Sequence, residues 1–195
     1  HYEKNGNYLM SLKMKITKIS KDVLIPTIWD GGETFEYYIH PENSLYANRD
    51  FLFRISAATI SKVPCTFTKF EDYQRFLVML DNNLHIEHND KEEHYTPNDI
   101  FKFDSNSDIV SYTKGNDFNL IVSKKVETAD FFFLHDVVRL KQSFIFLFAL
   151  NDTSIEVNNE KINLKMNDLL LIENSDRFDV TLKKEDSILV GSLVV

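Results

Sequence analysis

The stretch HIEHNDKEEH, residues 85–94, holds three of the six histidines of the chain together with four acidic residues. Imidazole and carboxylate groups are the usual ligands of zinc and related metals, so this segment is the first candidate for metal chemistry. Its asparagine-rich context predicts a β-hairpin, and successive side chains of a strand point to opposite faces. His85 and His88, three residues apart, then cannot bind one ion. We therefore expect a solvated hairpin, with no metal and no cofactor.

A second group of polar residues stands inside apolar runs. FLFRISAATI, residues 51–60, is apolar on both faces, as fully buried strands are, yet Arg54 lies in its middle on the face that carries Ser56. Arg75 opens the apolar run RFLVML, and Asn119 lies within FNLIVS. An arginine is almost never buried without a partner, because desolvating its guanidinium costs several kcal/mol.

Two arginines and one amide inside strands predict a polar pocket for a ligand that carries a carboxylate. The planar guanidinium offers a fork of donors that matches both carboxylate oxygens. The alternative is a set of internal ion pairs, in which Arg54 or Arg75 binds Glu36 or Asp117. The sequence leaves both interpretations open.

The elements that must position these residues are predominantly strands. Helical periodicity is scarce, whereas short apolar or alternating runs recur between polar turns, which indicates an all-β sandwich or barrel. One turn of helix is expected at residues 70–74. The expected strands are 34–40, 51–60, 75–80, 84–88, 99–103, 118–123, 143–150, 154–157, 168–173, 178–182 and 188–195.

A weak internal repeat links two parts of the chain. IEHNDKEEHYTPND, residues 86–99, matches IEVNNEKINLKMND, residues 155–168, at five of fourteen positions without a gap. Further on, the same shift pairs Asp117 with Asp186. The repeat predicts a duplicated fold with a first lobe over residues 14–125 and a smaller second lobe over residues 126–195. In this duplicated hairpin His94 matches an asparagine, so the histidines are not required for folding.

Composition restricts the function. The 195 residues carry a net charge of -8, which disfavours nucleic acid and anionic membranes as partners. The single Cys65 excludes an internal disulfide and fits a cytoplasmic protein. No apolar run approaches the roughly 20 residues that span a bilayer. Residues 1–13 lack an apolar signal-peptide core, and we expect a flexible leader there, either native or foreign to the domain.

Several motifs together resemble the HutD/Ves family. They are Trp29 with the Gly31-Gly32 pair and Thr34, then Arg54-Ile55-Ser56 with Ala58, then Phe67 and Phe70, then Arg75, then Asp117-Phe118-Asn119. They follow the family's order and cover residues 14–125. The resemblance implies a bicupin, that is, two fused cupin-like antiparallel barrels, without a metal.

The resemblance also implies a function. Family members are associated with histidine utilisation and look like regulators that bind a pathway metabolite, such as formylglutamate or urocanate. Carried over, Arg54 and Arg75 would hold a carboxylate, and Asn119 would orient a second polar group. Trp29, Thr34 and Ser56 would form the wall of the pocket. The alternatives are a metal-dependent cupin enzyme of the dioxygenase or isomerase type, and a protein-binding module in which the repeat forms a homodimer interface.

Overall fold

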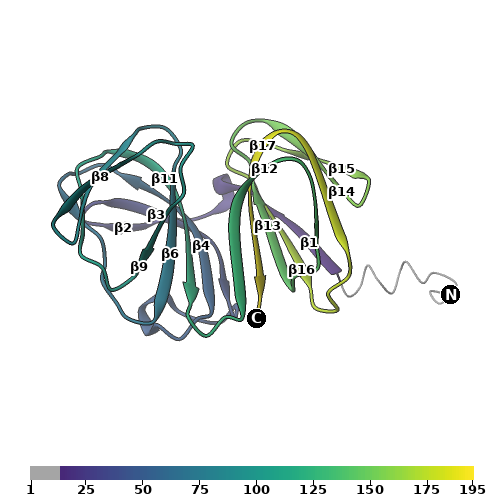
Figure 1. Ribbon diagram of the computed structural model, residues 1–195, viewed down its shortest axis with the longest axis horizontal. Coiled ribbons are helices and arrows are strands. Elements are labelled where there is room, and N and C mark those ends of the chain that lie inside the picture. The colour runs from purple at the N-terminus through teal and green to yellow at the C-terminus, as the bar shows by residue number, and fades with distance from the viewer. Residues whose placement is uncertain (1–13) are drawn as a thin grey trace, which may run out of the picture. The chain divides into compact units, whose positions relative to one another are not determined.

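The computed structural model describes residues 14–195, and the predicted leader at residues 1–13 lies outside the described residues. The described chain contains no α-helix, and its only helical segments are two short 3-10 turns, η2 (Lys21–Val23) and η3 (Tyr46–Asn48). The prediction of an all-β protein is therefore confirmed (Figure 1). The strands are β1 (Met14–Ile19), β2 (Thr27–Trp29), β3 (Gly32–His40), β4 (Phe53–Ile60), β5 (Cys65–Thr66), β6 (Tyr73–Met79), β7 (Leu84–His88), β8 (Lys91–Tyr95), β9 (Phe101–Asp104), β10 (Ile109–Ser111), β11 (Gly115–Ser123), β12 (Thr128–Leu140), β13 (Phe144–Phe148), β14 (Thr153–Val157), β15 (Glu160–Leu164), β16 (Leu169–Asn174) and β17 (Val180–Val194).

Residues 24–125 form one compact unit of two sheets. The larger sheet has the strand order β2-β3-β4-β11-β6-β9, and the smaller has the order β5-β10-β7-β8. Inward side chains of both sheets, such as Leu77 and Ile86, share one buried cluster with the aromatic rings of Phe101 and Phe103. Burial of this apolar surface from both sheets holds them together.

Residues 126–195 form the second unit together with residues 14–23. Its strands make one sheet in the order β1-β16-β13-β17-β14-β15, and β12 pairs with β17 as well. The core is a cluster of aliphatic side chains, including Ile145, Leu147, Ile188 and Val190, all of which are fully buried.

The first strand corrects the predicted boundary between the lobes. β1 pairs along its whole length with β16, from Met14 opposite Asn174 to Ile19 opposite Leu169. Residues 14–23 therefore belong with residues 126–195, and the other unit begins at Leu24 rather than at Met14. The alternation of MKITKI indicates a strand, but it carries no information on which distant strand will be its partner.

The hairpins of the predicted repeat have the same structure. β7 and β8 are joined by Asn89 and Asp90, and β14 and β15 are joined by Asn158 and Asn159. The φ angles are 49° and 69° in the first turn and 49° and 68° in the second. Two positive φ angles define the turn that suits the twist of a two-residue hairpin, and Asn and Asp tolerate them.

The shift that aligns the hairpins does not extend to the last strands. Asp117 is buried, whereas Asp186 is exposed, so the predicted match between them is wrong. Strand pairing gives the better correspondence: Leu77 lies opposite Asn119 on β6 and β11, and Leu147 lies opposite Val190 on β13 and β17.

Most expected strands are present, and the structure adds the short strands β2, β5 and β10, which were not predicted. Residues 70–74 form no helix, because Tyr73 already begins β6. The long strand β12 has no clear alternation in its sequence and was not predicted. The segments 178–182 and 188–195 are joined in one strand, β17, which continues through the charged residues between them.

Candidate functional site

A cavity of about 230 Å³ lies within the unit of residues 24–125. All six residues predicted to bind a ligand line it, together with ten others. The lining residues are Thr27, Trp29, Thr34, Tyr46, Arg54, Ser56, Ala58, Ile60, Thr66, Phe67, Thr68, Arg75, Leu77, Asp117, Asn119 and Ile121. The structure therefore brings the predicted residues together, and their contact with a ligand stays a prediction.

Strand alternation explains why the polar residues meet. β11 lies between β4 and β6, so Asn119 stands opposite Ser56 on one side and Leu77 on the other. Two residues further along, Ile121 pairs with Arg54 and with Arg75. Residues two apart share a face of the sheet, and this face is the floor of the cavity.

Arg54 is held by a carboxylate and an aromatic ring. Its side chain is 10% exposed, and its Nε donates to Glu36 Oε1 at 2.7 Å. The guanidinium carbon lies 3.9 Å from the centre of the Tyr46 ring, a cation–π arrangement. The internal ion pair considered for Arg54 is therefore present. Its two terminal nitrogens make no hydrogen bond to any residue from 14 to 195.

Arg75 lacks a carboxylate partner among the described residues. Its Nη1 donates to the carbonyl oxygen of Thr68 at 3.0 Å, and its guanidinium carbon lies 5.2 Å from the centre of the Phe103 ring. The Nε atom is buried and finds no acceptor in the described chain. Burial lowers the pKa of Arg75, while nearby Tyr46 and Asp117 oppose this shift. A buried donor without a partner costs free energy, so this atom is a place where a ligand oxygen would be stabilising.

Asp117 supplies the only carboxylate of the cavity lining. It is 1% exposed and accepts a hydrogen bond from the Asn119 amide. Burial raises the pKa of Asp117 to about 7, although the Asn119 hydrogen bond and the charge of Arg75 favour the ionised form. The cavity therefore carries its greatest positive charge when Asp117 is protonated.

The wall of the cavity includes the hairpin of β2 and β3. Trp29 Nε1 donates to Thr34 Oγ1 at 3.0 Å, which fixes the indole across the hairpin. A Cβ at Gly31 would lie 2.1 Å from the Trp29 ring, and one at Gly32 would lie 1.8 Å from the Thr59 carbonyl oxygen. Glycine is therefore required at both positions, because the Trp29 ring and the Thr59 carbonyl leave no room for a Cβ atom. The sequence predicts a tight turn here, and the pair lies in it.

This arrangement suits a small anion rather than a transition metal. The lining offers two guanidinium groups, one amide, several hydroxyls and a single carboxylate, with no histidine. Ten lining residues were not predicted as part of the site, and two of them carry polar groups beside the arginines. Asp117 could have been found, since it shares the alternation of Asn119, whereas Tyr46 belongs to the short turn η3 and gives no signal in the sequence.

The histidine-rich hairpin lies apart from the cavity lining. His85 and His88 point to opposite faces of β7, as expected from their spacing. His88 contacts Glu93 at 3.1 Å, whereas His85 lies beside His94 and Glu92 on the exposed face. The pairing of His85 with His94 across the hairpin was not predicted, because spacing along one strand does not reveal it.

Comparison with known proteins agrees with this architecture. Nothing in the described residues is a helix with the length and apolar character needed to cross a membrane. The chain is similar to PA5104 of Pseudomonas aeruginosa PAO1, described as a conserved protein of unknown function, with 20% identity and a TM-score of 0.79 over 93% of this chain and all of that one. It is also similar to HutD from Pseudomonas fluorescens SBW25, with 21% identity and a TM-score of 0.78 over 92% of this chain and 98% of that one.

More distant structures share the fold alone. A cupin 2 conserved barrel domain protein from Leptotrichia buccalis has 9% identity and a TM-score of 0.57, over 91% of this chain and 96% of that one. A search of curated proteins gave no significant match. A model of the HutD family matches residues 24–190, which is most of the chain. The chain therefore belongs to the HutD family and has a cupin-like, all-β fold.

Proposed function

We propose that this protein binds a small carboxylated metabolite in the cavity of residues 24–125 and acts in regulation or sensing. The observation that carries the proposal is the pair of arginines on one cavity floor, of which Arg75 has a buried Nε without an acceptor in the part of the chain that the structure describes. A carboxylate is the anion whose two oxygens match a guanidinium fork.

The surrounding groups support the same class of ligand. Asn119 and Ser56 lie two residues along their strands from Ile121 and Arg54, on the same floor, and offer an amide and a hydroxyl. The rings of Phe67 and Trp29 add apolar wall, which suits a ligand with a short carbon skeleton or a planar ring. A volume of about 230 Å³ limits the ligand to the size of a small metabolite.

Intermediates of histidine degradation are our first candidates, because the chain belongs to the HutD family. Formylglutamate offers two carboxylates and a formamide, and urocanate offers one carboxylate on a planar imidazole. Among the described residues Asp117 accepts its side-chain hydrogen bond from Asn119 and none from a serine or threonine hydroxyl of the lining, which favours binding over catalysis. A cytoplasmic location and self-association as a homodimer stay predictions.

We also propose that the two units are the two barrels of a bicupin that arose by duplication. The matching turn angles at Asn89 and Asn158 support this origin, as does the same capping of the next turn. The Asp99 carboxylate accepts from the Thr96 amide at 2.7 Å, and the Asp168 carboxylate accepts from the Lys165 amide at 2.9 Å.

A thermal-shift panel tests the ligand proposal, with formylglutamate, urocanate, glutamate and unrelated dicarboxylates as probes. A ligand at 100 times its dissociation constant stabilises the folded protein by about 2.7 kcal/mol, which is readily measured. We expect one acid to raise the melting temperature of the wild type. Arg75→Met should abolish that shift, and Arg75→Lys should weaken it, because an ammonium lacks the fork.

The matched control is Arg139→Met, an exposed arginine on β12 that does not line the cavity. It should keep the full shift. Circular dichroism establishes that each variant is folded before its shift is compared. The proposal fails if no acid stabilises the wild type, or if the folded Arg75 variants respond as the wild type does.

A further inference from the structure

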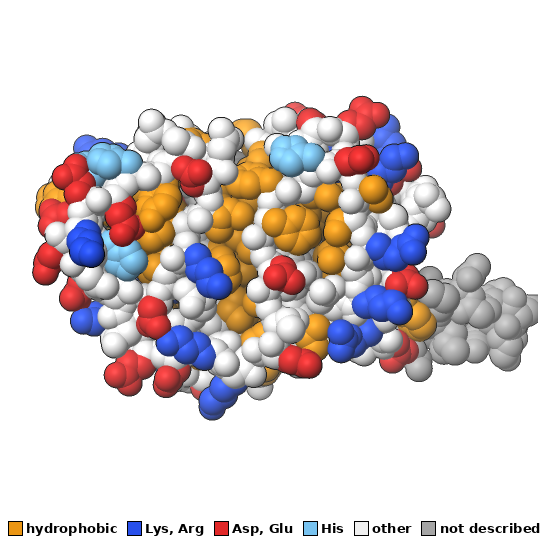
Figure 2. Space-filling view, viewed as in Figure 1, with side chains coloured by type: hydrophobic (Ala, Val, Ile, Leu, Met, Phe, Trp, Pro, Cys, Tyr) orange, Lys and Arg blue, Asp and Glu red, His pale blue; other side chains and the backbone are white. Residues whose placement is uncertain are grey.

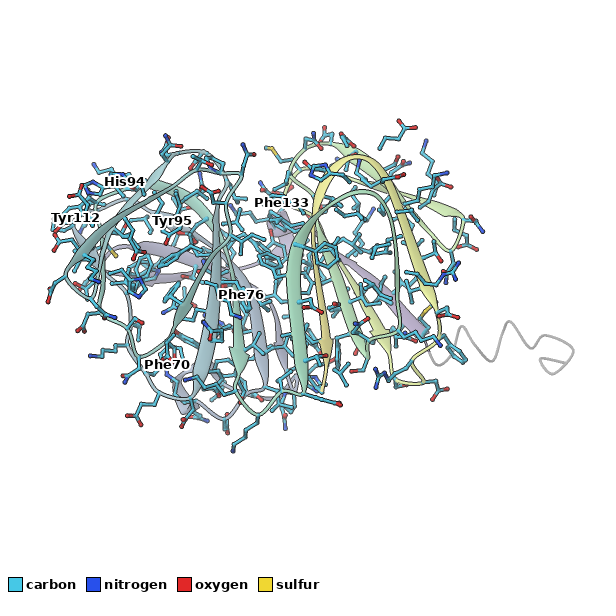
Figure 3. All side chains as sticks on the ribbon, viewed as in Figure 1. Phe70, Phe76, His94, Tyr95, Tyr112 and Phe133 are labelled. Carbon is cyan, nitrogen blue, oxygen red and sulfur yellow. The ribbon has the colours of Figure 1, made fainter. Side chains whose placement is uncertain are left out.

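The exposed face of the β7–β8 hairpin brings three potential metal ligands together. His85, Glu92 and His94 each offer one donor atom, and these atoms lie within 4.8 Å of one another. Figure 2 shows histidine and acidic side chains together on the surface over β8. In Figure 3 His94 lies on the outside of this unit near Tyr112, while Tyr95 comes from the same strand. No other group of this kind occurs among residues 14–195.

The hairpin register creates this cluster. The turn at Asn89 and Asp90 sets His85 opposite His94 and Glu87 opposite Glu92, so all four side chains emerge on one face. The imidazole rings of His85 and His94 are stacked, with centroids 4.5 Å apart and planes 12° apart. Glu87 is engaged by the hydroxyl of Tyr112, which leaves Glu92 as the carboxylate between the two imidazoles.

The donor atoms already converge. The Nε2 atoms of His85 and His94 lie 3.0 and 3.1 Å from the same oxygen, Glu92 Oε1. Ligand atoms around a tetrahedral zinc ion are about 3.3 Å apart, given bonds of about 2.0–2.1 Å. The three side chains are 42%, 63% and 64% exposed, so rotation about their own bonds is sufficient to admit an ion.

The duplicated hairpin shows that folding does not require this set. In β14 and β15 the positions of His85, Glu92 and His94 are taken by Ser154, Lys161 and Asn163, on the same turn geometry. A hairpin with no such ligand set therefore forms equally well. On the inner side of β7 and β8, His88 instead contacts Glu93 and packs its ring against Phe101.

We propose that His85, Glu92 and His94 form a surface site for a divalent transition-metal ion such as zinc, separate from the carboxylate cavity. Two imidazoles and one carboxylate are ligands that suit zinc, nickel and copper, whereas magnesium and calcium prefer oxygen. Three protein ligands leave a coordination position for water or an outside group.

Titration of the chelator-treated full chain with Zn²⁺ alone, followed by isothermal calorimetry, tests this site. We expect wild type to bind zinc at this site, His94→Ala to bind it at least about tenfold more weakly, and Glu92→Gln to weaken it less. His88→Ala is the matched control, since His88 lies on the same hairpin but on the opposite face. It should retain the wild-type affinity.

A second readout identifies the ligands directly. Nitrogen NMR of the histidine side chains should show zinc-dependent shifts at Nε2 of His85 and His94 and none at His88. Equal zinc affinity in wild type and His94→Ala, or equal losses in His94→Ala and His88→Ala, would overturn the proposal. Arg75→Met should bind zinc normally, so failure of the carboxylate proposal and failure of the metal site are distinguishable.

Discussion

The two units use equivalent strands for opposite purposes. In residues 126–195, β13 and β17 direct Ile145, Leu147, Ile188 and Val190 into a core of aliphatic side chains. In residues 24–125, β6 and β11 direct Arg75, Asp117 and Asn119 into a cavity. The pair Leu147–Val190 of one unit corresponds to Leu77–Asn119 of the other. The unit of residues 126–195 has a filled apolar core at these positions, whereas the unit of residues 24–125 has a polar cavity there.

This difference has a physical consequence for stability. Buried charges and polar groups cost free energy unless they are paired. In the cavity, the Nε of Arg75 finds no acceptor within residues 14–195, and burial raises the pKa of Asp117. At the corresponding positions of the other unit, Ile145 and Val190 are apolar and fully buried, so this strand arrangement does not require polar residues there, which supports the proposed binding site.

The largest expected effect comes from moving a cavity residue into the filled core. Ile145→Arg places a guanidinium at the position that corresponds to Arg75, where the side chain is fully buried in an aliphatic cluster. We expect a loss of roughly 5 kcal/mol, which approaches the whole stability of many domains. Urea unfolding of the purified variant measures it. The reciprocal change, Arg75→Ile, should alter stability by about 1 kcal/mol or less, or increase it. Equal losses for both substitutions would contradict the comparison.

A smaller effect is expected at Asp117, through pH. Its folded pKa of about 7 lies above the value of 3.8 for a free aspartate, so the folded state holds the proton more tightly. The contribution of Asp117 to stability is therefore fully present below about pH 4 and should fall by on the order of 4 kcal/mol as the pH rises to 7. Asp117→Asn should remove this part of the pH dependence. Unfolding free energies at several pH values test it, with the exposed Asp130→Asn on β12 as control. An unchanged slope in Asp117→Asn would refute the assignment.

The smallest effect should be the same in both units. Asn89 and Asn158 occupy left-handed positions, and their Oδ1 atoms accept from the amides of Asp108 at 2.9 Å and Thr181 at 2.8 Å. Alanine at either position loses both the conformational tolerance and the hydrogen bond, at a cost of about 1–2 kcal/mol. Thermal unfolding of Asn89→Ala and Asn158→Ala should give losses of unfolding free energy that agree within about 0.5 kcal/mol. Glycine variants separate the two causes, because glycine tolerates the positive φ angle but cannot make the side-chain hydrogen bond. A clear inequality would show that the hairpins are not equivalent.

Much of the fold could be predicted from the sequence because strand and turn signals are local. The hairpin within residues 86–99 and its match within residues 155–168 are visible in turn residues and alternation. The long strand β12 was missed because its FFFLHDVV segment has no regular alternation. The boundary at Leu24 was missed because the partner of β1 is a strand about 150 residues away in the chain.

The sequence by itself determined that Arg54 shares a strand face with Ser56, because alternation within a strand is fixed by backbone geometry. Strand pairing then placed Arg75 and Asn119 on the same face of the sheet. Only the tertiary structure decided how these residues are partnered, since hydrogen bonds and ion pairs depend on which strands lie side by side. In the structure Arg54 forms an ion pair with Glu36, whereas the Nε of Arg75 has no acceptor in the described chain. The tertiary structure also brought His94 beside His85, which spacing along the chain cannot show, because strand pairing joins residues across a turn.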